Sequence, residues 1–138
     1  MDQQHIREAA QRFIGQLDRL EQGDPGATDD LLALFADDAH LTNPIIEHAG
    51  GERVGRDAIA DFWRAYRGSF GHIHSEFHDI TAGEQSAGLF WHSQGAGPDG
   101  QPVSYDGVTL LNFDDGGRIT RLKGYFDRDQ VRLKTGAH

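Results

Sequence analysis

The chain has 138 residues, of which 37% are hydrophobic, and its 22 Asp and Glu against 13 Lys and Arg give a net charge of −9. That length is the size of one domain, so we treat residues 1–138 as a single domain, and the scattered basic residues of an acidic chain exclude nucleic acid and anionic membranes as expected partners. The sequence contains no cysteine, which excludes disulfides, thiolate metal sites and a cysteine nucleophile.

The N-terminal residues do not resemble an export signal. Met1–Glu8 lacks the apolar core of a signal peptide, and no stretch of the sequence approaches the roughly 18 apolar residues of a membrane span. We therefore expect a cytoplasmic protein.

Three helices are predicted from apolar residues spaced three and four positions apart. The first covers His5–Leu20, the second begins at the N-cap residue Thr28, and the third begins at Gly55. Their apolar stripes are Ile6, Ala10, Phe13, Leu17 and Leu20; Leu31, Leu34 and Phe35; and Ile59, Phe62, Trp63, Tyr66 and Phe70.

Between the second and third helices, the sequence predicts a short strand over Ala39–Asn43, stopped by Pro44, and then a mobile loop over Ile45–Val54. After Gly71 the apolar period changes from about 3.6 to 2, which predicts a long strand. The tail, Arg128–His138, is expected either to add a helical turn through Val131 and Leu133 or to fray.

Three turn sequences divide the remainder into strands. The turns are Ala82–Gln85, Gly97–Gly100 and Asp114–Gly117, and the strands that they join after the first are Ala87–Gly95, Val103–Phe113 and Arg118–Asp127. Helices followed by an antiparallel meander define an α+β domain rather than a βαβ repeat. Three helical stripes must cover one sheet face, so we expect the sheet to curl around them.

Three segments resemble the nuclear transport factor 2-like superfamily in its SnoaL-like branch. They are Ala36–Ala39 ahead of a strand that ends in Asn43-Pro44, Gly55–Ile59, and Asn112–Asp127. The resemblance covers nearly the whole chain and implies a cone-shaped barrel, in which a strongly curved, mostly antiparallel sheet wraps around three helices and leaves a deep apolar pocket. Members include steroid isomerases, polyketide cyclases, epoxide hydrolases, dehydratases and proteins that only bind, so the fold alone does not determine the chemistry.

The resemblance also implies which residues of each strand face the pocket. Its expected polar groups are Asn43, His92, Tyr105 and Thr109. A mostly apolar pocket with a few polar groups suits an apolar ligand that carries one or two oxygens. The expected ligand-binding residues are Phe13, Leu17, Leu41, Phe62, Tyr66, Phe90, Leu111, Leu122 and Phe126, and Gln94, Gly107 and Gly124 are also expected to face inward.

The best-known catalytic groups of the family have no counterparts in this sequence. The resemblance places the basic aspartate of the steroid isomerases at Asn43, their oxyanion-stabilising tyrosine at Phe13 and their protonated aspartic acid at Thr109. In the epoxide hydrolases the asparagine is kept, but one aspartate position falls on Gly124 and another close to His92. We expect both mechanisms to be absent.

Among the sheet residues expected to face the pocket, His92 is then the only one that transfers protons near pH 7. It is expected to act as the acid–base group of an isomerisation, a cyclisation or a dehydration, with Tyr105, Asn43 or Thr109 holding a developing oxyanion. Such an isomerase, cyclase or lyase would need neither metal nor organic cofactor. The alternative is a buried neutral histidine bonded to Tyr105 or Asn43.

Three functions stay open. The chain is a cofactor-independent enzyme acting on a small, mostly apolar substrate through His92, a non-catalytic binder of a small apolar ligand, or a dimeric interaction module. Strand alternation predicts that Trp91 faces away from the pocket, and we expect a homodimer through the outer sheet face around it.

Two further groups of polar residues have alternative readings. Asp18 and His74 are the nearest counterparts of the aspartate and histidine paired in dehydratases, although alternation puts His74 on the outer face. His72, His74, Glu76 and His78 share one strand face, as zinc ligands would, but residues two apart on a strand are separated by roughly 7 Å. We interpret this face as solvated or as part of an interface.

Overall fold

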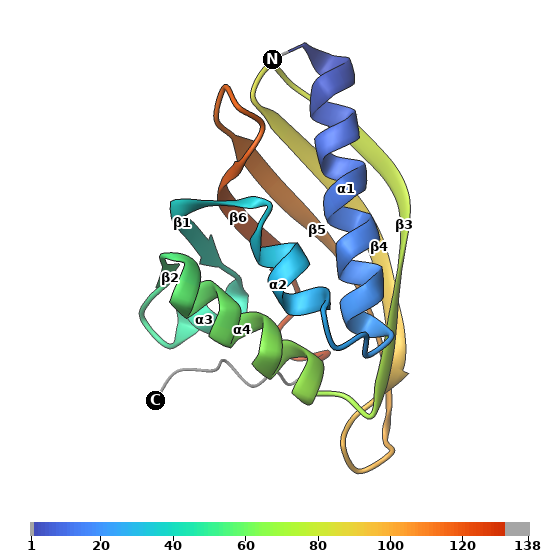
Figure 1. Cartoon of the computed structure of the whole chain (residues 1–138). Helices are drawn as coiled ribbons and strands as arrows, with labels where there is room; N and C mark the ends of the chain where they lie inside the picture. The colour runs from blue at the N-terminus through green and yellow to red at the C-terminus, as the bar shows by residue number, and fades with distance from the viewer. Residues whose placement is uncertain (1, 132–138) are drawn as a thin grey trace.

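The computed structural model describes residues 2–131, in which helices and a mixed sheet follow the order α1, α2, β1, α3, β2, α4 and then β3 to β6 (Figure 1). The helices are α1 (Gln3–Glu21), α2 (Ala27–Leu32), α3 (Pro44–His48) and α4 (Arg56–Gly68). The strands are β1 (Phe35–Thr42), β2 (Arg53–Val54), β3 (His72–Ala82), β4 (Ser86–Ala96), β5 (Pro102–Phe113) and β6 (Ile119–Phe126).

The six strands form one sheet in the order β2-β1-β6-β5-β4-β3. β1 runs parallel to β6, and every other neighbouring pair is antiparallel. Because β2 and β3 are edges that do not pair with each other, the sheet is curved but not closed into a barrel. The α+β class and the mostly antiparallel sheet are confirmed.

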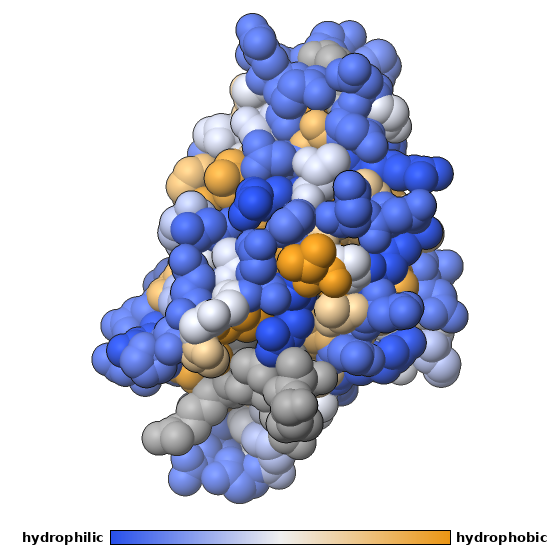
Figure 2. All heavy atoms as spheres, turned by 90° about the vertical axis from the view of Figure 1, so that its left-hand side faces the viewer, coloured by the Kyte–Doolittle hydropathy of each residue, from blue (hydrophilic) through white to orange (hydrophobic). Residues whose placement is uncertain are grey.

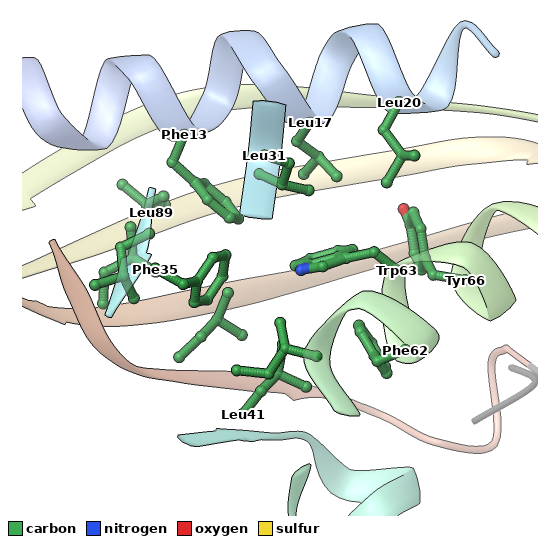
Figure 3. Close-up of a cluster of buried hydrophobic side chains, with 14 of the residues drawn as sticks. Phe13, Leu17, Leu20, Leu31, Phe35, Leu41, Phe62, Trp63, Tyr66 and Leu89 are labelled. Atoms are coloured by element: carbon green, nitrogen blue, oxygen red, sulfur yellow. The ribbon is translucent and has the colours of Figure 1, made fainter. Parts of the chain in front are cut away.

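The helices α1, α2 and α4 lie on one face of this sheet (Figure 1). Asp2 begins α1 as its N-cap, since its side chain accepts a hydrogen bond from the backbone N–H of His5 at 2.9 Å. Apolar side chains of α1 and α4 point toward the sheet and form the core with Leu31, Phe35 and Leu89 (Figure 3). Among the described residues, no helix is long and apolar enough to cross a membrane.

The side of the molecule that carries β1 and β2 is mostly hydrophilic, and its apolar residues form small separate groups (Figure 2). This pattern agrees with the acidic composition, because all the charged residues described except Glu21 are at least partly exposed.

The second helix is shorter than predicted. It ends at Leu32, and Phe35 begins β1 instead of completing the helical stripe. The Arg56 guanidinium holds this start of β1, because its Nε and Nη2 donate to the carbonyl oxygen of Phe35 at 3.1 and 2.7 Å.

The segment over Ile45–Val54 was predicted to be a loop without regular structure, and this prediction is wrong. It contains most of the short helix α3 and all of β2, which pairs with β1 through His40 and Val54. The predicted tail helix falls largely outside the described residues, although Val131 is buried.

Candidate functional site

A cavity lies between α1, α4 and the sheet face that the helices cover. Half of its lining residues are aromatic, and most of the others are small or apolar. The lining consists of Phe13, Leu17, Thr42, Asn43, Phe62, Trp63, Tyr66, Ser75, Phe77, Trp91, Ser93, Tyr105, Thr109, Leu122, Gly124 and Phe126.

The cavity is small. The volume in which the centre of a water molecule fits is about 60 Å³, and the whole hollow, including the part open to solvent, encloses about 530 Å³. By the first measure one water needs about 10–15 Å³, so the free space holds a few waters. Pockets for drug-sized ligands enclose about 300–1,000 Å³, several times the 60 Å³ that is free here, so this cavity suits a molecule of about one ring.

Two packed groups of aromatic rings form opposite walls. On α4, Trp63 and Tyr66 meet edge to face with ring centroids 5.6 Å apart. On the sheet, Trp91 and Tyr105 meet edge to face at 5.3 Å, and Tyr105 meets Phe126 at 5.6 Å. Because edge-to-face pairs are mutually stabilising, these walls are held in place without a ligand.

Asn43 lines the cavity as the N-cap of α3. Its Oδ1 accepts hydrogen bonds from the backbone N–H groups of Ile45 and Ile46, both at 2.9 Å. This oxygen therefore has a structural role, and the Nδ2 amino group is the part of the side chain left for the cavity.

The two tryptophans of the chain both line the cavity and differ in their hydrogen bonding. The indole N–H of Trp91 donates to Thr109 Oγ1 at 2.9 Å. The indole N–H of Trp63 is buried and has no hydrogen-bond partner among the described residues. A buried donor without a partner destabilises the folded protein, and a ligand that accepts its hydrogen bond would remove this cost.

Glu21, the last residue of α1, is buried directly behind the cavity wall at 3% exposure. Its Oε1 accepts from the backbone N–H of Ser75, and its Oε2 accepts from the Ser75 hydroxyl and from the Tyr66 hydroxyl, all at 2.7 Å. Ser75 Oγ also lies 2.5 Å from Ser93 Oγ. In Figure 3 the Tyr66 hydroxyl points from α4 toward the C-terminal end of α1.

Two phenols at this wall have altered acidity. Burial raises the pKa of Tyr66 well above its usual value, and the negative charge of Glu21 raises it further. Burial and then Glu21 raise the pKa of Tyr105 as well. Both phenols therefore stay protonated near neutral pH, where they donate hydrogen bonds and do not act as bases.

The family follows from a match of residues 10–122 to the model of the SnoaL-like domain. The chain belongs to the SnoaL-like family. No curated protein sequence matches it.

Solved structures share the fold of this SnoaL-like protein. An NTF2-like protein of unknown function from Exiguobacterium sp. 255-15 is 24% identical, with a TM-score of 0.74 over 86% of this chain and 98% of that one. The epoxide hydrolase/cyclase-like enzyme SalBIII, which has a role in pyran ring formation in the polyether salinomycin, is 16% identical, with a TM-score of 0.75 over 96% and 98%. The Δ5-3-ketosteroid isomerase from Mycobacterium sp. is 21% identical, with a TM-score of 0.71 over 94% and 98%.

In this SnoaL-like protein, His92 does not face the cavity, which corrects the sequence-based assignment. It lies on the outer sheet face, where Nδ1 is 2.7 Å from Asp106 Oδ1 and Nε2 is 3.2 Å from Ser104 Oγ. The inward residues of β4 are its neighbours Trp91 and Ser93.

The length of one hairpin loop explains this error. A four-residue turn over Gly97–Gly100 would pair Ala96 with the next residue, Gln101, and so His92 with Tyr105. The structure instead pairs Ala96 with Pro102, and therefore Ser93 with Tyr105. A shift of one residue moves every side chain of a strand to the other face.

The same shift reverses the assignments of Trp91, Phe90 and Gln94. Trp91 is buried at 8% exposure in the cavity wall, so it is not the outward anchor expected for a homodimer. Phe90 and Gln94 lie on the outer face with His92.

The remaining predicted residues divide between the cavity and the core. The cavity lining contains Asn43, Tyr105, Thr109, Phe13, Leu17, Phe62, Tyr66, Leu122 and Phe126. Leu41 and Leu111 face inward as expected, but both are completely buried in the core and do not line the cavity.

The two side chains of the expected dehydratase-type pair lie close to each other, but neither lines the cavity. Asp18 Oδ1 and His74 Nδ1 are 3.6 Å apart, and their side chains are 41% and 62% exposed. Among residues 2–131, no group of three or more His, Cys, Asp or Glu side chains is placed to hold a metal ion.

Sequence reasoning missed Glu21 and Ser93. Glu21 lies four residues after Leu17, so it continues the apolar stripe of α1, and a carboxylate on a buried stripe was the available signal. Ser93 could have been identified by choosing the more apolar of the two faces of β4 as the inward one, because Ser93 shares that face with Ala87, Leu89 and Trp91.

Proposed function

We propose that this SnoaL-like protein binds a small, mainly apolar molecule that carries at least one polar oxygen or nitrogen, and that it does so without acid–base catalysis. The observation that supports this most strongly is the composition of the cavity. Its described lining is largely aromatic and aliphatic, and none of those residues is Asp, Glu, His, Lys or Arg. Such walls gain free energy by burying apolar surface.

The polar groups at the wall favour a ligand that is not purely hydrocarbon. Ser93, Tyr105 and the amino group of Asn43 border the cavity, and the Trp63 N–H has no partner within residues 2–131. A hydrocarbon would displace the water from the cavity and leave these polar groups without hydrogen bonds, which costs free energy.

Binding is favoured over catalysis because the proton transfers expected of His92 need a general base at the cavity, and none of the described lining residues supplies one. His92 lies on the other face of the sheet, and the pKa of Tyr66 and of Tyr105 is raised, so neither phenol supplies a base at neutral pH. The named structural neighbours include enzymes, but at these identities the likeness concerns the fold.

Isothermal titration calorimetry with cyclohexanol, a single ring with one oxygen, tests this proposal. Gly124→Ala serves as the blocking variant, because a Cβ there would protrude into the cavity while meeting Asn43 Cβ at 3.4 Å and Phe126 at 3.7 Å, which are ordinary contacts. Gly15→Ala is the matched control, since Gly15 lies on the exposed side of α1 with nothing near its missing Cβ.

We expect saturable binding to the natural protein and to Gly15→Ala, and a loss of about tenfold in affinity for Gly124→Ala, because one methyl group changes a small apolar site by that order. No saturable binding to the natural protein, or equal affinity for all three proteins, would refute the proposal.

A further inference from the structure

We infer that Glu21 sets the hydrogen-bonding polarity of the part of the cavity wall that Ser93 and Tyr66 form, so that a ligand with a hydroxyl group to donate is preferred over the matching carbonyl compound. This inference rests on the proposed function and names the chemical class that the site takes. It follows from counting protons in the chain of contacts that links Glu21 to the cavity.

Glu21 is an acceptor at every contact that the structure gives it. The backbone N–H of Ser75 can only donate, so Oε1 accepts. Oε2 receives the hydroxyls of both Ser75 and Tyr66. Three donors therefore converge on one carboxyl group.

The direction of each hydroxyl proton then follows. Ser75 has one proton, and at 2.7 Å from a carboxylate oxygen it must point to Glu21, because two lone pairs at that distance would repel. Ser75 therefore has none left for Ser93, so in their 2.5 Å contact Ser93 is the donor. Tyr66 likewise gives its proton to Glu21.

The cavity consequently meets oxygen lone pairs at Ser93 and Tyr66, whose only hydroxyl protons are used behind the wall. Both residues line the cavity, and Ser93 and Ser75 face each other on neighbouring strands β4 and β3. An alcohol or phenol can donate to these lone pairs. A ketone of the same shape can accept from the Trp63 N–H or the Asn43 amide, as an alcohol also can, but it leaves the lone pairs of Ser93 and Tyr66 without a donor.

The position of Glu21 is costly to folding, which points to a role beyond stability. A carboxylate at the last residue of a helix lies at the negative end of the helix dipole. It is also buried, and among the described residues no Lys, Arg or His forms an ion pair with it. Its hydrogen bonds go to the residues that form the cavity wall.

A matched pair of probes, cyclohexanol and cyclohexanone, tests the inference on the natural protein by calorimetry or NMR titration. We expect the alcohol to bind at least about tenfold more tightly than the ketone, because only the alcohol satisfies the lone pairs. If both bind with equal affinity, or the ketone binds more tightly, the role of Glu21 is refuted while the ligand site stands. If neither binds, the ligand site itself is refuted, and this inference with it.

Glu21→Gln tests the proton count directly. The amide keeps one acceptor for the Ser75 N–H but places N–H donors where Oε2 was, so the Ser75 and Tyr66 protons must turn away. Ser75 would then donate to Ser93, and the wall would present protons to the cavity. We expect the preference to shift from alcohol toward ketone, and a folded Glu21→Gln protein that keeps the full alcohol preference would overturn the inference.

Ser93→Ala provides a second variant that does not alter the buried charge. It removes one of the two acceptors, so the alcohol preference should fall by several-fold while ketone affinity stays within about twofold. Ser104→Ala on the outer face of β5 is the matched control and should keep the natural preference, since Ser104 contacts His92 and not the cavity. An unchanged preference in Ser93→Ala would contradict the inference even if Glu21→Gln failed to fold.

Discussion

Gly107 leaves the space that the indole of Trp91 occupies. A Cβ at this position would lie 2.4 and 2.5 Å from two ring carbons of Trp91 and 2.6 Å from the carbonyl oxygen of Tyr125. Real carbon atoms do not approach so closely, so any larger residue must displace the ring or the neighbouring strand.

We therefore predict that Gly107→Ala lowers the free energy of unfolding by about 1–3 kcal/mol, the usual cost of overpacking. Urea unfolding followed by tryptophan fluorescence measures this, with Gly124→Ala as the control because its new Cβ would make only ordinary contacts. Equal stability of Gly107→Ala and the natural protein would show that Trp91 does not occupy this position.

His92 is predicted to be dispensable for ligand binding. Its ion pair with Asp106 joins side chains that are 38% and 79% exposed, and exposed pairs contribute no more than about 1 kcal/mol. His92→Gln should therefore bind cyclohexanol as the natural protein does. A loss of binding would show that His92 contributes to the ligand site after all.

At the scale of single residues, the sequence predicted cavity residues on α1, α4, β5 and β6 and failed on β4. Thr109, Tyr105 and Leu122 were assigned correctly because β5 and β6 are joined by a clear turn and alternate cleanly. His92 was misassigned because Gly97-Pro98-Asp99-Gly100 suggests a turn one residue shorter than the loop that forms. Local sequence preferences do not fix that count, which depends on the hydrogen bond that the Gly97 N–H donates to the carbonyl oxygen of Gln101 across the loop.

Among the elements, α1 supplies the cavity with Phe13 and Leu17 and ends at Glu21. Gly15 lies on its exposed side, where its missing side chain costs helix stability without serving a contact. Glycine inside a helix is less favourable than alanine by roughly 0.5–1 kcal/mol.

Gly15→Ala should consequently raise the free energy of unfolding by about 0.5–1 kcal/mol. Chemical unfolding followed by circular dichroism measures the gain, and the slope against denaturant concentration should not change. A destabilised variant would contradict the open space around Gly15 on the exposed side of α1.

The helix α3 shows why Asn43 was only partly understood from sequence. Its place in the cavity was predicted, but its use as an N-cap was hidden because the following segment was taken for a loop. Pro44 fits the first turn of a helix as well as it ends a strand, so the sequence supported both readings.

For the whole molecule, the fold was predicted almost completely, since it depends on the order of helical stripes and hairpins and tolerates errors of a few residues at each boundary. The site depends on strand register, where one residue is decisive. The buried carboxylate of Glu21 was hidden for another reason, because its partners Tyr66 and Ser75 come from distant parts of the chain.

The raised pKa of Tyr66 and Tyr105 links their ionisation to global stability. The folded protein holds both as neutral phenols, whereas in the unfolded chain a tyrosine ionises near about pH 10. This contribution to stability is therefore complete below about pH 10 and is lost as pH rises above it.

In a Tyr125→Phe variant, which keeps only Tyr66 and Tyr105, phenolate absorbance should appear only together with unfolding. Absorbance and circular dichroism recorded on the same alkaline titration test this. Phenolate formed while the native circular dichroism persists would contradict the buried network.

A homodimer through the outer sheet face remains a proposal, but Trp91 no longer supports it. Tyr125 on β6, at 45% exposure, is a large side chain exposed on that face. Light scattering at micromolar concentration should give a dimer that Tyr125→Glu dissociates, and a monomeric natural protein would refute it.

The most direct test of the central claim uses the two tryptophans, because both indole rings line the cavity from opposite walls. In a titration of ¹⁵N-labelled protein with cyclohexanol, we predict that the Trp63 and Trp91 indole N–H resonances shift together and saturate at one midpoint. The account is contradicted if both indole resonances stay fixed while the ligand saturates the protein elsewhere, or if no resonance responds.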